Sequence, residues 1–247
     1  MDSRLYNEFS EIYEDHWWFK GRLKILESIF DGYLRPLAAG KQISILDVGC
    51  GTGSYFPILS RYGKVFGAES DDSAIRELME RKVPAEIYKA ELPNMDLKRK
   101  FDAATAFEIL EHVEEDEAAM KNIFDHLENG GLLIGTVPAY QWLWSKHDEL
   151  AHHKRRYTRK MLKQHLEEAG FEVVKISYYN TFLFPVAAAV RILKKTILKN
   201  ILPVSDFSAT AGPFDKVFEV IFASEQFWLK RFNFPFGFSL IFVASKK

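Results

Sequence analysis

Three glycines spaced two apart, Gly49, Gly51 and Gly53, follow Asp47 in the stretch ISILDVGCGTG, residues 43–53. Glycine has no Cβ atom, so it adopts positive φ readily and lets a ligand approach the main chain closely. The apolar run before the turn is typical of a buried parallel strand. We predict that residues 54–63 form the next helix, so that a ligand on the turn would meet free backbone N–H groups.

A second group of reactive side chains lies in the stretch VPAYQWLWSKHDELAHHKRRYT, residues 137–158. It follows a predicted strand, and ligands of open α/β sheets bind beyond the carboxyl ends of the strands. His147 and His153 from this stretch, and His112 from an earlier one, are candidate general bases, which a reaction at a hydroxyl group needs. The sequence therefore predicts a substrate pocket near residues 137–158.

The same stretch leaves two further interpretations open. Arg155 and Arg156 are expected either to bind an anionic group of a substrate or to lie in solvent at a helix start. The spacing of His147, Asp148, His152 and His153 matches no familiar metal site, and adjacent histidines usually point apart. We therefore expect no metal site.

The elements that must position these residues alternate between strand-like and helix-like patterns. A mainly parallel sheet with helices on both faces is the expected result. The predicted strands lie within 43–49, 64–69, 85–90, 101–107, 131–137, 171–179 and 239–247, and the predicted helices within 21–34, 70–82, 114–131 and 158–171. The helices in 114–131 and 158–171 are expected to stop at their glycines.

Residues 179–236 differ in composition, being rich in Phe, Leu, Ile and Val and interrupted by prolines. Two interpretations stay open: a helical layer that completes the core, or an apolar cap that faces a substrate or a membrane surface and is flanked by Lys194, Lys195 and Lys199. The longest weakly charged stretch is shorter than the roughly 20 residues of a spanning helix, so no transmembrane segment is expected.

Composition narrows the class of protein. The chain has 247 residues, Lys+Arg 33 against Asp+Glu 34, and a net charge of -1, so no basic field favours nucleic acid. Its single cysteine, Cys50, excludes an internal disulfide framework. The N-terminal segment is acidic and aromatic and lacks the pattern of a signal peptide. We expect a cytoplasmic protein, with peripheral membrane contact left open and the oligomeric state unknown.

The glycine spacing separates two ligands that use such a turn. Dinucleotide-binding proteins carry G-x-G-x-x-G, whereas DVGCGTG has G-x-G-x-G after Asp47. The chain resembles, over about residues 40–178, the class I S-adenosylmethionine-dependent methyltransferases, and most closely their small-molecule type 11 group. The resemblance implies an α/β, Rossmann-like doubly wound sheet of about seven strands, mainly parallel, with an antiparallel last strand.

The resemblance also implies roles for individual residues in binding S-adenosylmethionine. Besides Asp47 and the three glycines, Glu69 would accept both ribose hydroxyls, and backbone carbonyls around Glu108 in FEILEHV would receive the ammonium group. Arg22 in HWWFKGR would pair with the methionine carboxylate, while the N-terminal aromatic segment closes over the cofactor. The alternatives are a solvated Glu69, an ordinary helix start at Glu108, and tryptophans on the sheet edge with Arg22 in solvent.

A third strand end completes the implied cofactor site. Ala90 and Glu91 in YKAELP would lie beside the adenine, although Lys89 stands where the family usually has Asp. That departure weakens the expected adenine contact.

The function implied is methyl transfer from S-adenosylmethionine, with S-adenosylhomocysteine as product, to a small-molecule or lipid-like acceptor. The alternatives are a non-catalytic cofactor-binding module and an NAD-linked oxidoreductase. The expected parts are an N-terminal helical lid at 1–39, a cofactor-binding core at 40–178, the apolar insertion at 179–236 and the last strand at 237–247.

Overall fold

The computed structural model describes residues 16–185, 188–189, 212 and 214–247. Seven strands of this part of the chain form one sheet in the order β3-β2-β1-β4-β5-β7-β6. The strands are β1 Ile43–Val48, β2 Gly63–Glu69, β3 Glu86–Lys89, β4 Phe101–Phe107, β5 Leu127–Pro138, β6 Glu172–Tyr179 and β7 Ser239–Ser245. Only β7 runs antiparallel to its neighbours, β5 and β6. The predicted Rossmann-like sheet is confirmed.

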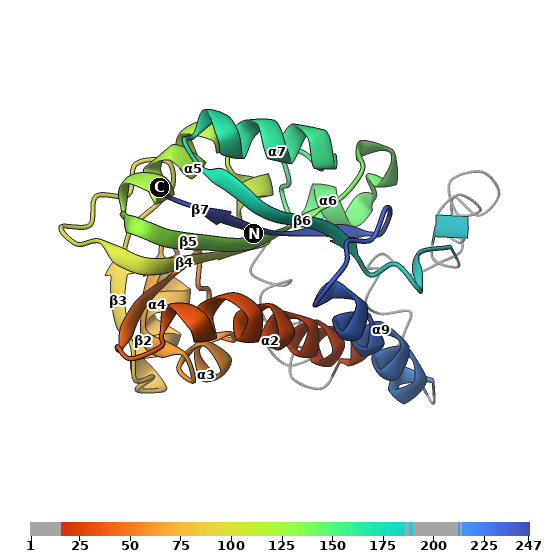
Figure 1. Cartoon of the computed structure of the whole chain (residues 1–247), viewed down its shortest axis with the longest axis horizontal. Coiled ribbons are helices and arrows are strands. Elements are labelled where there is room, and N and C mark those ends of the chain that lie inside the picture. The colour runs from red at the N-terminus through yellow and green to blue at the C-terminus, as the bar shows by residue number, and fades with distance from the viewer. Residues whose placement is uncertain (1–15, 186–187, 190–211, 213) are drawn as a thin grey trace.

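Helices cover both faces of this sheet (Figure 1). On one face lie α2 Trp17–Leu37, α3 Phe56–Leu59, α4 Asp72–Glu80 and α9 Asp215–Leu229. On the other lie α5 Asp116–Asp125, α6 Lys146–Leu150 and α7 Arg159–Glu168, and the single 3₁₀ turns η1 Leu110–His112 and η2 Gln141–Leu143 occur in the loops after β4 and β5. Strand order reverses at β1, which pairs with β2 on one side and β4 on the other. Such a reversal opens a crevice beyond the carboxyl ends of the strands.

Helix α2 is the N-terminal helix expected over 21–34, extended at both ends. The ring of His16 caps its start by accepting a hydrogen bond from the Trp18 N–H, 3.2 Å away. Its apolar face is fully buried against the sheet, with Ile25, Leu26, Phe30 and Leu34 at 0% exposure. Arg22 lies on the same buried face, so the packing of α2 delivers a guanidinium to the interior.

Two local predictions need correction. The helix expected within 54–63 is present but is only the single-turn α3, because the backbone after the glycine turn continues in turns as far as Tyr55. The helix expected to stop at glycines ends at Asp125 instead, and Gly130 and Gly131 belong to β5. There β4 and β5 change register between Phe101 and Ala103, so the glycines accompany an irregularity of the sheet rather than a helix stop.

The insertion between β6 and β7 is described in part. Helix α9 packs along α2, where the ring of Trp17 lies 5.6 Å from Phe218 and that of Trp18 lies 6.5 Å from Phe222. The tryptophans therefore contact α9 rather than a sheet edge. The Lys194, Lys195 and Lys199 group, Phe207 and residues 1–15 of the expected lid lie outside the described residues.

Helix α9 has two different faces. Phe222 and Leu229 are fully buried, whereas Phe214 is 65% and Phe227 is 70% exposed. One face completes the core, as one of the two interpretations expected, and the other presents aromatic rings to the surface. Among the described helices, none has both the length and the hydropathy to cross a bilayer.

Candidate active site

The glycine turn lies at the end of β1, where the strand order reverses. Gly49, Gly51 and Gly53 all have positive φ, at 68°, 53° and 77°. A Cβ atom on Gly49 would lie 2.7 Å from the Ile109 side chain, and one on Gly53 would lie 2.8 Å from Phe56. Internal packing, and not only a ligand, therefore excludes side chains at these two positions.

Four backbone N–H groups of this turn are engaged within the protein: those of Gly49 and Cys50 by the Ala68 carbonyl at 2.8 and 3.2 Å, that of Gly51 by the Glu69 carboxylate at 2.8 Å, and that of Gly53 by the Cys50 carbonyl at 2.9 Å. Binding of a ligand to free N–H groups of the turn therefore stays a prediction for its other positions. The turn also offers an adjacent carboxylate.

Glu69 ends β2 directly beside the turn. One carboxylate oxygen accepts from the Gly51 N–H, and the other accepts from the N–H groups of Ser70 and Asp71 at 2.8 and 2.9 Å. A carboxylate has about four acceptor positions, so capacity remains for a hydroxyl group of a ligand. Glu69 is thus not merely a solvated strand end.

The other strand-end residues near Glu69 are arranged as follows. The Ala90 N–H donates to the Glu69 carbonyl at 2.9 Å, which sets the segment after β3 alongside the end of β2. Glu91 is exposed. The Lys89 ammonium group pairs with Asp72 at the start of α4, 2.7 Å away. The adenine contact of Ala90 and Glu91 stays a prediction.

Asp47 lies behind the turn and is 2% exposed. One oxygen accepts from the Thr105 hydroxyl at 2.7 Å, and the other has no partner among the described residues. Burial raises the pKa of Asp47 to about 7, and the nearby Glu69 charge adds to the effect. Its observed contact is structural, so its expected contact with the cofactor stays a prediction.

Arg22 and Glu108 form a charged pair at the same edge of the sheet, in which Arg22 is fully buried and the Glu108 side chain is 27% exposed. The Nη2 atom of Arg22 donates to Glu108 Oε1 at 3.2 Å and to the Thr136 hydroxyl. Its guanidinium also lies 4.9 Å from the Trp18 ring centre. Burial works to raise the pKa of Glu108, but the Arg22 charge and hydrogen bonds from Glu111 and Thr136 hold it below its usual value. The solvated Arg22 considered from the sequence was wrong.

The backbone at Glu108 is unusual for a non-glycine residue. Its φ of 52° lies in the left-handed region, and its N–H donates to the Thr136 carbonyl at 3.1 Å. The chain then enters η1 rather than a regular α-helix, so the ordinary helix start is also wrong. Non-glycine residues in this region concentrate at functional sites. This conformation turns the chain sharply where β4 ends and η1 begins.

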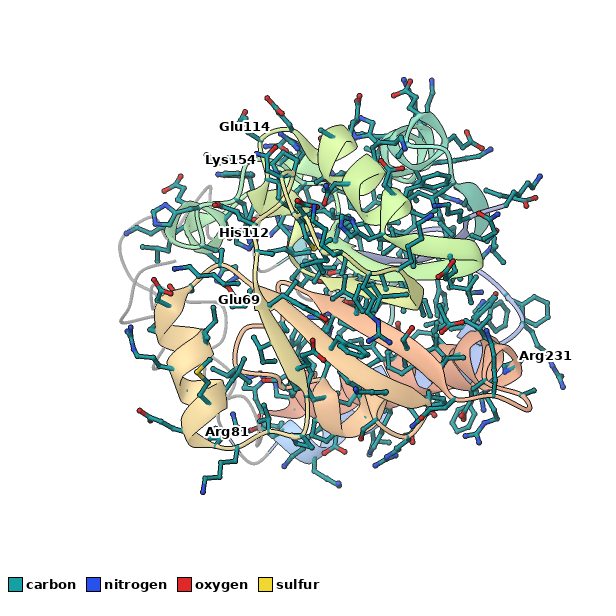
Figure 2. The ribbon with its side chains drawn as sticks, turned by 90° about the vertical axis from the view of Figure 1, so that its left-hand side faces the viewer. Glu69, Arg81, His112, Glu114, Lys154 and Arg231 are labelled. Atoms are coloured by element: carbon teal, nitrogen blue, oxygen red, sulfur yellow. The ribbon has the colours of Figure 1, made fainter. Side chains whose placement is uncertain are left out.

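The three candidate bases come together although they are far apart in sequence. The rings of His112 and His153 are 4.7 Å apart, and those of His147 and His153 are 6.0 Å apart. Burial, with the neighbouring His153, lowers the pKa of His112 to about 4. His112 is therefore neutral near pH 7. Figure 2 shows Glu69 and His112 on the same side of the molecule, with Arg231 on the opposite side.

The two arginines serve the architecture of the loop. Arg156 is 7% exposed, its Nε and Nη2 bind the buried Asp148 at 2.7 and 2.9 Å, and its Nη1 binds the Ala139 carbonyl. Arg155 pairs with Asp116 at 2.6 Å. Neither expected role fits Arg156, because each of its three guanidinium nitrogens makes a hydrogen bond inside the protein.

Sequence reasoning missed Glu111 and the role of Asp148. Glu111 is fully buried next to Glu108, and Asp148 Oδ1 lies 2.8 Å from His153 Nδ1. The repeated acid in E-I-L-E-H, residues 108–112, was a signal for Glu111, since residues three apart share one side of a helical turn. No local pattern in the sequence joins Asp148 to Arg156.

A family of proteins described as a methyltransferase domain matches residues 22–176, which is more than half of the chain. The chain belongs to the class I S-adenosylmethionine-dependent methyltransferases. Membership in this family argues against both alternatives from the sequence, the NAD-linked oxidoreductase and the non-catalytic cofactor-binding module.

Individual relatives are distant. A ubiquinone biosynthesis O-methyltransferase of Coxiella burnetii is 28% identical over 144 residues, which cover 54% of this chain and 61% of that protein. The chain thus matches less than two thirds of that relative. A methyltransferase structure from Clostridium acetobutylicum has a TM-score of 0.59 at 12% identity, covering 98% of this chain and 99% of that one.

A further structure is the N-methyltransferase NodS of Bradyrhizobium japonicum in complex with S-adenosylhomocysteine. Its TM-score is 0.51 at 15% identity, with 66% of this chain and 80% of that chain covered. At such identities the structures show a shared fold. Because an O-methyltransferase and an N-methyltransferase both occur among these proteins, the fold leaves the acceptor atom open.

The edge of the sheet fits the family's cofactor. A carboxylate with spare acceptor capacity, Glu69, stands beside the turn, which suits a ribose diol. The positive φ of Gly51 bends the main chain at the β1 end. Bound there, the cofactor supplies a sulfonium methyl group that is already activated, so the chain's own residues need to bind it, orient an acceptor and exclude water.

Proposed function

We propose that this methyltransferase moves a methyl group from S-adenosylmethionine to a hydroxyl oxygen of a small-molecule or lipid-like acceptor. The observation that carries the proposal is the convergence, at one edge of the sheet, of the Glu69 end of β2 with a buried polar cluster that contains the neutral imidazole of His112. A hydroxyl acceptor must lose its proton, whereas the sulfonium itself needs no acid. The name of the Coxiella relative supports oxygen as the acceptor atom.

In this proposal different residues at this edge of the sheet bind the cofactor and the acceptor. Glu69 binds the ribose, Ala90 and Glu91 border the adenine, and the backbone around Glu108 receives the ammonium group. Arg22 is fully buried and already paired with Glu108, so its charge is shared between that carboxylate and the methionine carboxylate of the cofactor. The cluster of His112, His147 and His153, with neighbouring rings 4.7 and 6.0 Å apart, would receive the proton of the acceptor.

The exposed face of α9 supports a lipid-like acceptor and contact with a membrane surface. Phe214 just before this helix, Phe227 and Trp228 within it, and Phe232 in the turn after it are 65%, 70%, 48% and 54% exposed. Aromatic rings gathered on one surface are typical of interfacial binding. The inner face of α9 packs against α2, and α2 carries Arg22. A lipid bound at the outer face of α9 would therefore lie near the candidate site. A cytoplasmic location stays a prediction.

A methyl-transfer screen tests the proposal. The full chain is incubated with S-adenosylmethionine carrying a labelled methyl group, and with polar metabolite and lipid extracts in separate reactions. We expect the label in a methyl ether, with more labelled product from the lipid extract than from the polar metabolite extract. Label only on nitrogen or carbon, or none with any extract while the cofactor binds, would contradict the proposal.

Two variants of α9 and one control variant on β6 test whether the exposed surface of α9 binds membranes. Phe227→Ala and Trp228→Ala should leave the melting temperature within a degree or two and reduce co-sedimentation with anionic liposomes. Exposed Val174→Ala, on β6, is the control for loss of an apolar surface group elsewhere. Equal retention of all variants by liposomes, or no retention of the wild type, would leave a soluble acceptor as the better proposal.

A further inference from the structure

The loop after β4 and the loop after α6 bring three metal-binding side chains together. Glu111, His112 and His153 each offer one ligand atom, and these atoms all lie within 4.8 Å of one another. The Lys154 N–H donates to the Glu111 carbonyl at 2.7 Å, which fastens the second loop to the first. The spacing of 41 positions between His112 and His153 explains why no sequence motif indicated this group.

The charges around the cluster do not balance. The guanidinium of Arg22 is already paired with Glu108, whose side chain is 27% exposed, and Asp148 is matched by Arg156, whereas the neighbouring Glu111 is fully buried. Both oxygens of Glu111 are buried, and within the described part of the chain no N–H or hydroxyl group donates to them; their polar neighbour is the Glu108 carboxyl group. A buried carboxylate of this kind costs several kcal/mol unless a cation or a proton offsets it.

The histidines have the features of metal ligands. His153 Nδ1 faces the buried carboxylate of Asp148 at 2.8 Å, which fixes the ring and leaves Nε2 as a ligand atom. Asp148 is itself held by Arg156 and by the Ser145 N–H, so this support is rigid. The ring of His112 lies 4.7 Å from that of His153, so that both imidazoles can reach one ion.

We infer that Glu111, His112 and His153 form a binding site for one divalent transition-metal ion of the Zn²⁺ class. Two imidazoles and a carboxylate suit Zn²⁺, Co²⁺ or Fe²⁺ better than Mg²⁺ or Ca²⁺, which prefer oxygen ligands. Three protein ligands leave at least one coordination position open. An acceptor hydroxyl bound at that position would release its proton to water more readily, and this role rests on the proposed function.

Metal binding itself is tested without any acceptor. The full chain, freed of metal with a chelator, is titrated calorimetrically with ZnCl₂ and, separately, with MgCl₂. We expect one Zn²⁺ per chain and far weaker Mg²⁺ binding. Glu111→Gln and His153→Ala should weaken Zn²⁺ by at least about 100-fold, and Asp148→Asn by about 10- to 100-fold, as loss of a supporting carboxylate usually does. His152→Ala, an exposed neighbour, should bind like the wild type.

A second measurement keeps the test valid if a variant is unstable. Excess Zn²⁺ should raise the melting temperature of the wild type and of His152→Ala but not of Glu111→Gln or His153→Ala. Co²⁺ should give visible absorption bands of nitrogen coordination that both variants lose. Absent Zn²⁺ binding, or equal binding in wild type and both variants, would overturn the site and leave a proton shared by Glu108 and Glu111. Failure of methyl transfer with intact Zn²⁺ binding would count against the proposed function alone.

Discussion

The two halves of the site are built in opposite ways. The β1–β2 half uses neighbours in sequence: the Gly51 N–H meets Glu69, 18 positions away, and the rest is turn backbone. The β4–β5 half joins side chains that are far apart, such as Arg22 with Glu108, 86 positions away. The first half is a local motif of turn backbone and one carboxylate, and the second is a network of charged side chains that reaches into the interior.

This difference predicts different consequences of substitution. Changing Gly51 or Glu69 should reduce ligand affinity, and any cost to stability should come from local backbone strain or lost turn hydrogen bonds. Changing a buried charge should alter stability and its pH dependence, because the partner is left desolvated. The insertion belongs with the second half, since the buried Glu225 of α9 accepts the Thr181 N–H at 2.6 Å across 44 positions.

The largest expected effect is that of Arg22→Met. It leaves Glu108 and Glu111 without their positive neighbour and should lower the free energy of unfolding by about 3–5 kcal/mol, the usual result of breaking a buried pair. Arg35→Met on the same helix is the control, because Arg35 pairs with Asp31 in solvent and should change stability by less than about 1 kcal/mol. Denaturant unfolding measures both, and equal losses would contradict the proposed difference between the halves.

The second prediction concerns pH. Burial raises the pKa of Glu225 to about 7, above the ordinary value of 4.5, against hydrogen bonds from Phe182 and Thr181. An acid whose folded pKa is raised stabilises the fold when protonated, so its contribution is lost as pH rises from about 4.5 to about 7. The free energy of unfolding of Glu225→Gln should therefore exceed that of the wild type by about 3 kcal/mol at pH 8 and should equal it at pH 4.

Glu219 on the same helix provides a control of opposite sign. The hydrogen bond from Lys24 lowers its pKa, so its stabilisation is present above its ordinary pKa of 4.5 and is lost as pH falls through the lower folded pKa. Glu219→Gln should lose stability at pH 8. Chemical unfolding between pH 4 and 8 measures both variants. If the stability of Glu225→Gln and that of Glu219→Gln changed with pH in the same way, burial at Glu225 would have no such effect.

The same contrast explains what the sequence could predict. The strand pattern and the glycine spacing identified the sheet, the family and the turn, because these depend on neighbouring residues. Glu69 was found for the same reason. The length of the helix after the turn and the stop of α5 were wrong because tertiary pairing overrode local propensity: Gly130 and Gly131 extend β5 beside β4.

The β4–β5 half could be predicted only in part. His112, His147 and His153 were selected as chemically capable residues, but their meeting depends on the fold of two loops. The pairing of Asp148 with Arg156 and the burial of Glu111 have no periodicity in the sequence, since a buried polar group is defined by its partners and not by its neighbours. Arg156 was misjudged because a basic residue beside a helix start is usually solvated.

The third prediction is on the local half. Gly51→Val should weaken S-adenosylmethionine by at least about 100-fold, or about 2.7 kcal/mol, because a β-branched residue is strained at a φ of 53° and fills space beside Glu69. Gly40→Val is matched, having a φ of 79° and open space around it. Both should lose a similar 1–3 kcal/mol of stability to backbone strain. Calorimetry should find affinity lost only in the first, and unchanged affinity in Gly51→Val would remove the cofactor from this turn.

The smallest expected effect is that of Glu69→Ala, which should weaken S-adenosylmethionine by about 1–3 kcal/mol, the usual cost of leaving a polar group without its charged acceptor. Part of any loss could come from the turn, since the Gly51, Ser70 and Asp71 N–H groups also lose an acceptor. An S-adenosylmethionine analogue without both ribose hydroxyls separates the two causes. If Glu69 binds the ribose, the variant loses more affinity for the natural cofactor than for the analogue, and the difference measures the diol contact. Equal losses would mean that Glu69 only shapes the turn, and the local half would then act through its backbone alone.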